Sequence, residues 1–114
     1  MPKPIETLLA EFETMLRDIT RDYAMKRYGK NQSRVYQRIA MVGPIEATRE
    51  MIRGRSHGGN WLVENGSHHL CIEWQVLNPY FARLFSDEDR ARAWGNLNVW
   101  AHELTGKPDQ RGAA

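Results

Sequence analysis

"IETLLAEFETMLRDITRDY" (residues 5–23) is the stretch that decides the fold class. Its apolar side chains recur every three or four residues, the spacing of one buried stripe along an α-helix. Pro4 suits a first helical turn, where its missing N–H has no intrahelical partner, and Gly29 suits the left-handed residue after a last turn. The stretch therefore predicts one long amphipathic helix. Its expected inward residues are Ile5, Leu8, Leu9, Phe12, Met15, Leu16, Ile19 and Tyr23.

Shorter helical patterns follow along the chain. Ser33 suits the cap of a second helix, and Gly43-Pro44 separates it from a third helix that ends at Gly54. "GRSHGGN" (residues 54–60) is the loosest stretch in the middle of the chain, and a short helix is expected over residues 60–65. The expected inward residues are Val35, Tyr36, Ile39 and Val42 in the second helix and Ile45, Thr48, Met51 and Ile52 in the third.

The C-terminal half begins with "SHHLCIEWQVL" (residues 67–77), which predicts one helix that Ser67 caps. Asn78-Pro79 ends it, because the residue before a proline is pushed out of helical geometry. A single turn over residues 80–85 precedes Ser86-Asp-Glu-Asp, a helix start with Asp89 at the capping-box position. The expected inward face of this last helix holds Ala91, Trp94, Leu97, Ala101 and Leu104.

Composition and pattern together set the fold class. A chain of 114 residues with 41% hydrophobic and 26% charged residues is ordinary for one globular domain. We find no alternating strand pattern, and no apolar run reaches the roughly 20 residues that span a bilayer. The first residues lack a secretory signal, and one cysteine cannot form an internal disulfide, so we expect a cytoplasmic protein. We predict an all-α fold: a single compact helical bundle of five or six helices over residues 1–106, with a flexible C-terminal tail over residues 107–114.

The segment from Asn65 to Phe85 raises the question of an active site, because it holds two histidines, the one cysteine and a glutamate. His68 and His69 are neighbours, so on a helix they point about 100° apart and do not chelate one ion together. We expect Cys71 to be an inert buried thiol and Glu73 to be a partly buried carboxylate with an arginine partner. No triad spacing, paired carboxylates or phosphate-binding glycine loop occurs, so we expect no catalytic residue, no metal, no cofactor and no enzyme activity.

Two longer stretches carry a resemblance, "MVGPIEATREMIRG" (residues 41–54) and "WLVENGSHHLCIEWQVLNPYFARLFSDEDRARA" (residues 61–93). Their order of residues resembles a group of small uncharacterised bacterial all-helical proteins. The chain departs from that group at Ser67, His68, His69 and Cys71, so the histidines and the cysteine are particular to this chain. The resemblance implies a bacterial or phage cytoplasmic helical domain and implies no activity. The residues that fit are Gly43, Ala47, Leu62, Glu64, Gly66, Leu70, Glu73, Val76, Leu77, Pro79, Phe81, Leu84 and Phe85.

The first functional hypothesis is a regulatory binding protein that acts by protein–protein contact. Exposed aromatic residues are common interface anchors, and Trp100 lies off the expected inward stripe of the last helix. We therefore expect Trp100, Trp61 and Tyr80 to bind a partner. By type of protein alone, a phage or mobile-element inhibitor of a host defence complex, similar to anti-CRISPR proteins, belongs to this class.

The alternative hypothesis is DNA or RNA binding. The stretch from residue 17 to residue 55 holds ten basic and four acidic residues, a net charge of +6. Three successive helices each carry one basic pair at i,i+4 spacing, and side-by-side packing of these helices would form one phosphate-facing patch. Interleaved acids such as Asp18, Asp22 and Glu50 favour a self-neutralised face instead. The six residues are Arg17, Arg21, Arg34, Arg38, Arg49 and Arg53.

Overall fold

The computed structural model describes residues 3–30, 34–54 and 59–105, the last four of these for their backbone only. Every regular element in this part of the chain is helical, which confirms the predicted all-α fold. The expected cap Ser33, most of the "GRSHGGN" connector and the tail over residues 107–114 lie outside the described residues. None of the described helices is long and apolar enough to cross a membrane.

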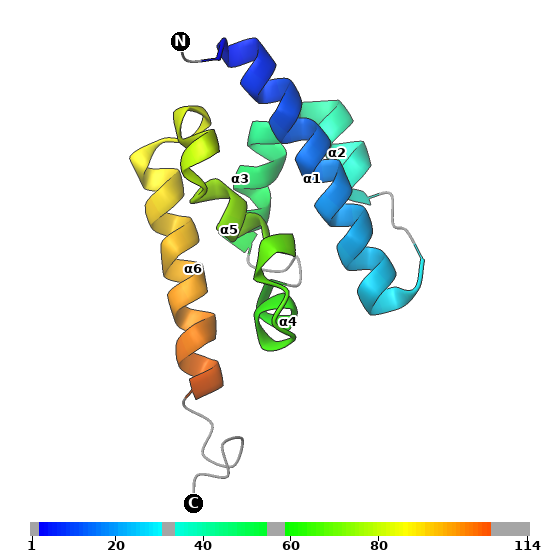
Figure 1. Ribbon diagram of the computed structural model, residues 1–114, viewed down its shortest axis with the longest axis vertical. Helices are drawn as coiled ribbons and strands as arrows, with labels where there is room; N and C mark the ends of the chain where they lie inside the picture. The colour runs from blue at the N-terminus through cyan, green and yellow to red at the C-terminus, as the bar shows by residue number, and fades with distance from the viewer. Residues whose placement is uncertain (1–2, 31–33, 55–58, 106–114) are drawn as a thin grey trace, which may run out of the picture.

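Helix α1 (Ile5–Tyr28) has the predicted bounds. Gly29 ends it with a φ of 75°, and its N–H donates to the carbonyl of Met25, so the predicted left-handed C-cap is confirmed. Phe12 is completely buried near the middle of the helix, whereas Ile5 at its start is exposed. Figure 1 shows α1 running diagonally across the bundle, from the end that carries the N-terminus toward α4.

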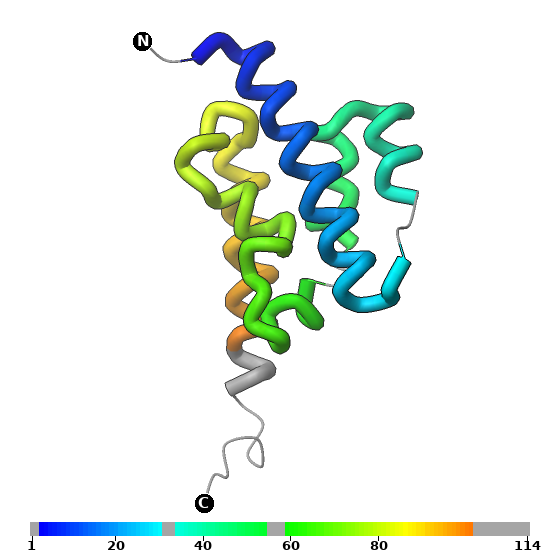
Figure 2. The backbone as a smooth tube through the Cα atoms, turned by 45° about the vertical axis from the view of Figure 1, so that its right-hand side comes forward, coloured from blue at the N-terminus to red at the C-terminus, as the bar shows by residue number. Residues whose placement is uncertain are grey.

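Helices α2 (Arg34–Val42) and α3 (Pro44–Gly54) form the predicted helical pair. Gly43 between them has a φ of 86°, and its N–H donates to the carbonyl of Ile39 at 2.9 Å, which closes α2 before Pro44 opens α3. Helix α3 also contacts α1, α5 and α6, so it lies in the interior of the bundle. Figures 1 and 2 place α2 and α6 on opposite flanks of the molecule.

The stretch from residue 59 to residue 84 forms four short elements: α4 (Gly59–Glu64), η1 (His68–Leu70), α5 (Ile72–Val76) and η2 (Pro79–Leu84), where η marks a 3-10 helix. The prediction of one helix over residues 67–77 is wrong, because Cys71 is extended (φ −84°, ψ 130°) and separates η1 from α5. Ser67 makes no capping hydrogen bond. The break turns Cys71, Ile72, Glu73 and Val76 inward and leaves Trp74 exposed.

Helix α6 (Asp87–Thr105) starts with the predicted capping box. The Ser86 N–H donates to the Asp89 carboxylate at 3.0 Å, and the Asp89 N–H donates to the Ser86 hydroxyl at 3.1 Å. The predicted inward face is wrong for three of its five residues: Trp94 is 59% exposed, and Ala91 and Ala101 are exposed as well. Leu97 is partly buried against the second cluster described below, and the side chain of Leu104 lies outside the described part of the chain. Two polar residues face inward instead: Asp89, which pairs with Arg49 on α3, and Asn96, which donates to Ile52 on α3 and to Glu73 on α5. Over residues 87–101, whose side chains are described, the buried residues are Asp89, Ala93, Asn96 and Trp100.

Two clusters of buried side chains hold these elements together. The main core joins α1, α2, α3, α5, η2 and α6, and Phe12 meets Phe81 and Phe85 there by edge-on ring contacts at 5.0 and 5.1 Å. The second cluster joins α4 to α6 around Cys71. It places α4 against the C-terminal half of α6. The buried members of the second cluster are Leu62, Val63, Cys71 and Trp100.

Candidate functional site

The three predicted partner-binding residues lie in different surroundings. The expectation that Trp100 is an exposed anchor is wrong, because it is 6% exposed in the second buried cluster. Tyr80 is 47% exposed, but its hydroxyl donates to the Glu11 carboxylate at 2.8 Å and the Lys3 ammonium lies 5.5 Å from its ring centroid. Trp61 is half-buried and joins a surface cluster of aromatic rings.

This surface cluster consists of Tyr23, Arg27, Tyr28 and Trp61, and we call it the aromatic–arginine cluster. The guanidinium carbon of Arg27 lies 5.9 Å from the ring centroid of Tyr23, 5.3 Å from that of Tyr28 and 5.2 Å from that of Trp61. A cation at this range is attracted by the negative faces of aromatic rings. The Tyr23 ring meets both other rings edge-on at 6.0 Å. The cluster is therefore a mutually supported group rather than a set of isolated side chains.

Local sequence explains how the cluster forms. Tyr23 and Arg27 are four residues apart on α1, so they share a helix face, and Arg27 donates to the Tyr23 hydroxyl at 2.7 Å. Burial raises the pKa of Tyr23 above its usual value, and the Tyr28 hydroxyl raises it further. Arg27 lowers this pKa but does not outweigh the other two effects, so the phenol is neutral. Lys26 donates to the Ser67 hydroxyl at 2.7 Å, which ties the end of α1 to the segment after α4.

A cleft of about 320 Å³ opens beside the cluster, between the C-terminal half of α1 and helices α2, α3 and α4. Tyr23 and Tyr28 line one side of it, so the cluster and the cleft share one wall. Arg34, Arg38 and Glu50 line the other side. The floor is aliphatic and is formed by Ile19, Ala24, Ala47, Leu62, Leu70 and Ile72.

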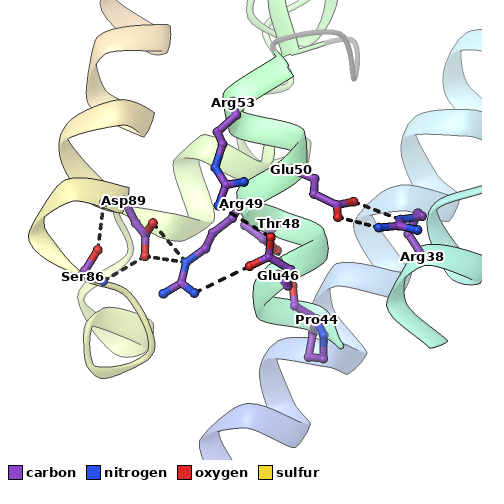
Figure 3. Close-up of polar contacts among 9 residues, drawn as sticks. All are labelled: Arg38, Pro44, Glu46, Thr48, Arg49, Glu50, Arg53, Ser86 and Asp89. Carbon is purple, nitrogen blue, oxygen red and sulfur yellow. Dashed lines mark hydrogen bonds and ion pairs between the residues drawn. The ribbon is translucent and has the colours of Figure 1, made fainter. Parts of the chain in front are cut away.

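The six arginines of the nucleic-acid hypothesis do not form one open patch. Figure 3 shows the Arg38–Glu50 pair on one side of α3 and the Arg49–Asp89 pair on the other. The Arg38–Glu50 pair has two contacts, at 3.0 and 2.5 Å, and Arg49 Nε lies 3.0 Å from Asp89. Five of the six therefore have a carboxylate partner within the protein, namely Arg17, Arg21, Arg38, Arg49 and Arg53.

Burial of Asp89 raises its pKa, but the Ser86 backbone N–H, Arg49 and the Ser86 hydroxyl outweigh this effect, so the pKa of Asp89 lies below its usual value. The Arg38 guanidinium lowers the pKa of Glu50 in the same way. Both carboxylates are thus ionised at neutral pH and compensate the charge of their arginines.

The histidine and cysteine segment forms a polar contact in the core. The Cys71 thiol donates to one oxygen of Glu73 at 3.0 Å, and the Asn96 amide donates to the other at 2.9 Å and to the Ile52 carbonyl at 2.8 Å. Burial, reinforced by Glu73, raises the pKa of Cys71 far above its usual value, so the thiol stays protonated.

Glu73 is fully buried, more deeply than the sequence predicts. Its predicted arginine partner stays a prediction. Among the described residues, no three histidine, cysteine or acidic side chains are arranged to hold a metal ion.

Comparisons with known proteins add no relative. No protein-family model matches the chain, and no curated protein and no solved structure matches it.

Proposed function

We propose that this protein is a non-enzymatic binding module that acts by protein–protein contact, and that its partner docks on the aromatic–arginine cluster and the adjoining cleft. One observation carries the proposal. Tyr23 and Tyr28 line a cleft of about 320 Å³ whose floor is mainly aliphatic, and beside the cleft Arg27 contacts both tyrosines and Trp61 contacts Tyr23. Trp, Tyr and Arg are the residue types most enriched among the energetically dominant residues of protein interfaces.

The arrangement of the cluster supports the proposal further. Arg27 and Tyr28 are exposed, so a partner has access to them, while contacts with Tyr23 and Trp61 limit their freedom before binding. Side chains that are already ordered lose less conformational entropy when a partner arrives. The protein would dock in the same way whether it is a regulator or an inhibitor of a host defence complex. The two roles differ only in the identity of the partner.

DNA or RNA binding through one patch of the six candidate arginines has less support. Phosphate binding requires cations whose charge is not already compensated, and five of the six candidate arginines pair with carboxylates of the same chain. Catalysis has no support from the described residues, because the polar group around Glu73 is buried in the core rather than placed in a cleft.

Affinity capture from the native host tests the proposal. The wild-type protein and the double variant Arg27→Ala/Tyr28→Ala serve as baits, and bound proteins are quantified by mass spectrometry. Truncating interface residues of this kind costs about 2 kcal/mol or more, so recovery of the partner should fall at least about tenfold. Circular dichroism confirms that the double variant is still folded.

Trp94→Ala is the matched control, because Trp94 is an exposed aromatic residue on α6, away from the cleft. We expect this control to recover the partner as well as the wild type does. Loss of the partner with Trp94→Ala and retention with the double variant would place docking on α6 and refute the proposed surface.

A further inference from the structure

The charges around the cleft are unevenly compensated. Arg27, Lys30 and Arg34 are exposed, and none of them forms an ion pair with a carboxylate in the described part of the chain. Arg34 lines the cleft, Arg27 belongs to the aromatic–arginine cluster, and Lys30 follows two residues after Tyr28. By contrast, Arg49 and Arg53 on the far side of α3 have carboxylate partners. Three uncompensated cations thus fall within residues 27–34, and one of them, Arg34, lines the cleft.

Among the described residues, the one carboxylate that lines the cleft does not compensate this charge. Glu50 is engaged by Arg38 through two contacts at 3.0 and 2.5 Å. That pair fixes the Arg38 guanidinium on the cleft wall, one helical turn after Arg34 on α2. Arg34 therefore presents the net positive charge of this wall.

The interior of the cleft has the opposite character. Its floor is aliphatic and includes the buried side chains of Ala47, Leu62 and Ile72. A volume of about 320 Å³ is near the lower end of the range of roughly 300–1,000 Å³ for binding pockets. A single large apolar side chain with its neighbours suits this size.

We propose that the partner presents an acidic segment: a large apolar side chain enters the cleft, and an adjacent aspartate or glutamate pairs with Arg34. This inference rests on the proposed function and specifies the chemistry of its partner. Arg27 and Lys30 attract further acidic residues at the rim. Complementary charge of this kind increases the association rate and selects among partners, while the buried apolar contact supplies most of the affinity.

A single-stranded nucleic acid is also acidic, but the geometry favours a peptide. Bases bind by stacking on exposed aromatic faces. Here the Arg27 guanidinium lies over the rings of Tyr23, Tyr28 and Trp61, and the rings meet edge-on. The floor is mainly aliphatic, and the Thr20 hydroxyl in the cleft lining already donates to the Leu16 carbonyl, so few hydrogen-bonding groups remain for base edges.

Peptide selection tests the inference. A phage-displayed library of random dodecapeptides is panned on the immobilised full-length protein, and the enriched peptides are synthesised with a fluorescein label. We expect enrichment of Asp or Glu beside Leu, Phe or Trp, and affinities that fall with added salt. Fluorescence anisotropy should show binding weakened at least about tenfold by Arg34→Glu, little changed by Arg34→Lys and unchanged by Arg92→Glu on α6.

The outcomes separate the two proposals. If the peptides lose binding with Arg27→Ala/Tyr28→Ala but not with Arg34→Glu, the acidic chemistry is wrong while the docking surface stands. If binding survives both changes, the proposed surface is wrong as well. Failure to enrich any peptide, enrichment of neutral or basic peptides, or displacement of the peptides by mixed-sequence single-stranded DNA overturns the inference.

Discussion

Trp100 and Trp94 test the orientation of α6 most directly, because they lie on the same helix in opposite surroundings. Trp100 is 6% exposed and Trp94 is 59% exposed. Burying an aromatic side chain removes roughly 200 Å² from water, which at about 25 cal/mol per Å² amounts to ~5 kcal/mol. Truncation of buried Trp or Phe in other proteins costs about 3–5 kcal/mol. Trp100→Ala should therefore lower the free energy of unfolding by about 3–5 kcal/mol.

Trp94→Ala is the matched comparison. Trp94 buries only about two-fifths of its surface, so the same conversion gives at most ~2 kcal/mol, and residual structure in the unfolded chain reduces this value. Alanine is also the better helix former, by about 0.5 kcal/mol. We expect Trp94→Ala to lower the free energy of unfolding by no more than about 1.5 kcal/mol.

Urea unfolding followed by far-ultraviolet circular dichroism measures both variants without relying on tryptophan fluorescence. Because 1 kcal/mol corresponds to about 4 °C for a domain of this size, Trp100→Ala should also lower the melting temperature by roughly 12 °C or more. Equal losses for the two variants, or a larger loss for Trp94→Ala, would refute the orientation. In that case Ala91 and Trp94 would face the core, as the sequence pattern suggests.

Three further predictions concern the buried polar groups. Asn96→Leu removes the amide that donates to Glu73 and to the Ile52 carbonyl, so urea unfolding should show a loss of about 2–4 kcal/mol. Asp89 has a folded-state pKa below its usual 3.8, so its stabilising effect is complete at neutral pH and is lost as the pH falls below about 4. Asp89→Asn should therefore melt lower at pH 7 but lose less stability on acidification than the wild type. Cys71 is fully buried and its pKa is raised, so a thiol reagent should label it no faster than the chain unfolds, and rapid labelling of native protein would contradict this burial.

Local signals were enough to predict the N-terminal half of the fold. Helix α1 has a dense apolar stripe and a glycine C-cap, and both depend only on residues close in sequence. The α2–α3 pair follows in the same way from Gly43 and the proline after it. Such signals act within one or two turns, so they do not depend on how the helices pack.

The C-terminal half is predicted less well, because contacts between distant residues decide it. The extended Cys71 is stabilised only once Glu73 is buried against Asn96, which lies on another helix. Apolar periodicity counts Asn96 and Asp89 as surface residues and so assigns the wrong face of α6 to the core. A pattern that records only which residues are apolar does not predict polar contacts within a core.

The candidate site also combines a local feature that the sequence indicates with a long-range contact that it does not. Apolar spacing assigns Tyr23 to the core stripe, and the search for exposed aromatic anchors indicates Trp61 but neither Arg27 nor Tyr28. The four-residue spacing of Tyr23 and Arg27 was a usable signal for a cation–aromatic pair on one helix face. Their meeting with Trp61 requires the packing of α1 near α4, and no local pattern reports that packing.

The buried polar contacts also explain why α6 does not turn its more apolar face inward. Residues on a helix are about 100° apart, so Trp94 and Asn96 point in nearly opposite directions. Trp94 is 59% exposed, so rotation of α6 to bury the rest of it would gain at most ~3 kcal/mol, but would take Asn96 from Glu73 and Asp89 from Arg49. An unsatisfied buried polar group costs about 1–3 kcal/mol, and Asn96, Glu73 and Asp89 would each lose a partner, so the observed orientation is favoured. The exposure of Trp94 thus follows from the polar core and needs no partner to explain it, whereas the aromatic–arginine cluster adjoins a cleft and uncompensated cations that the packing of the core does not require.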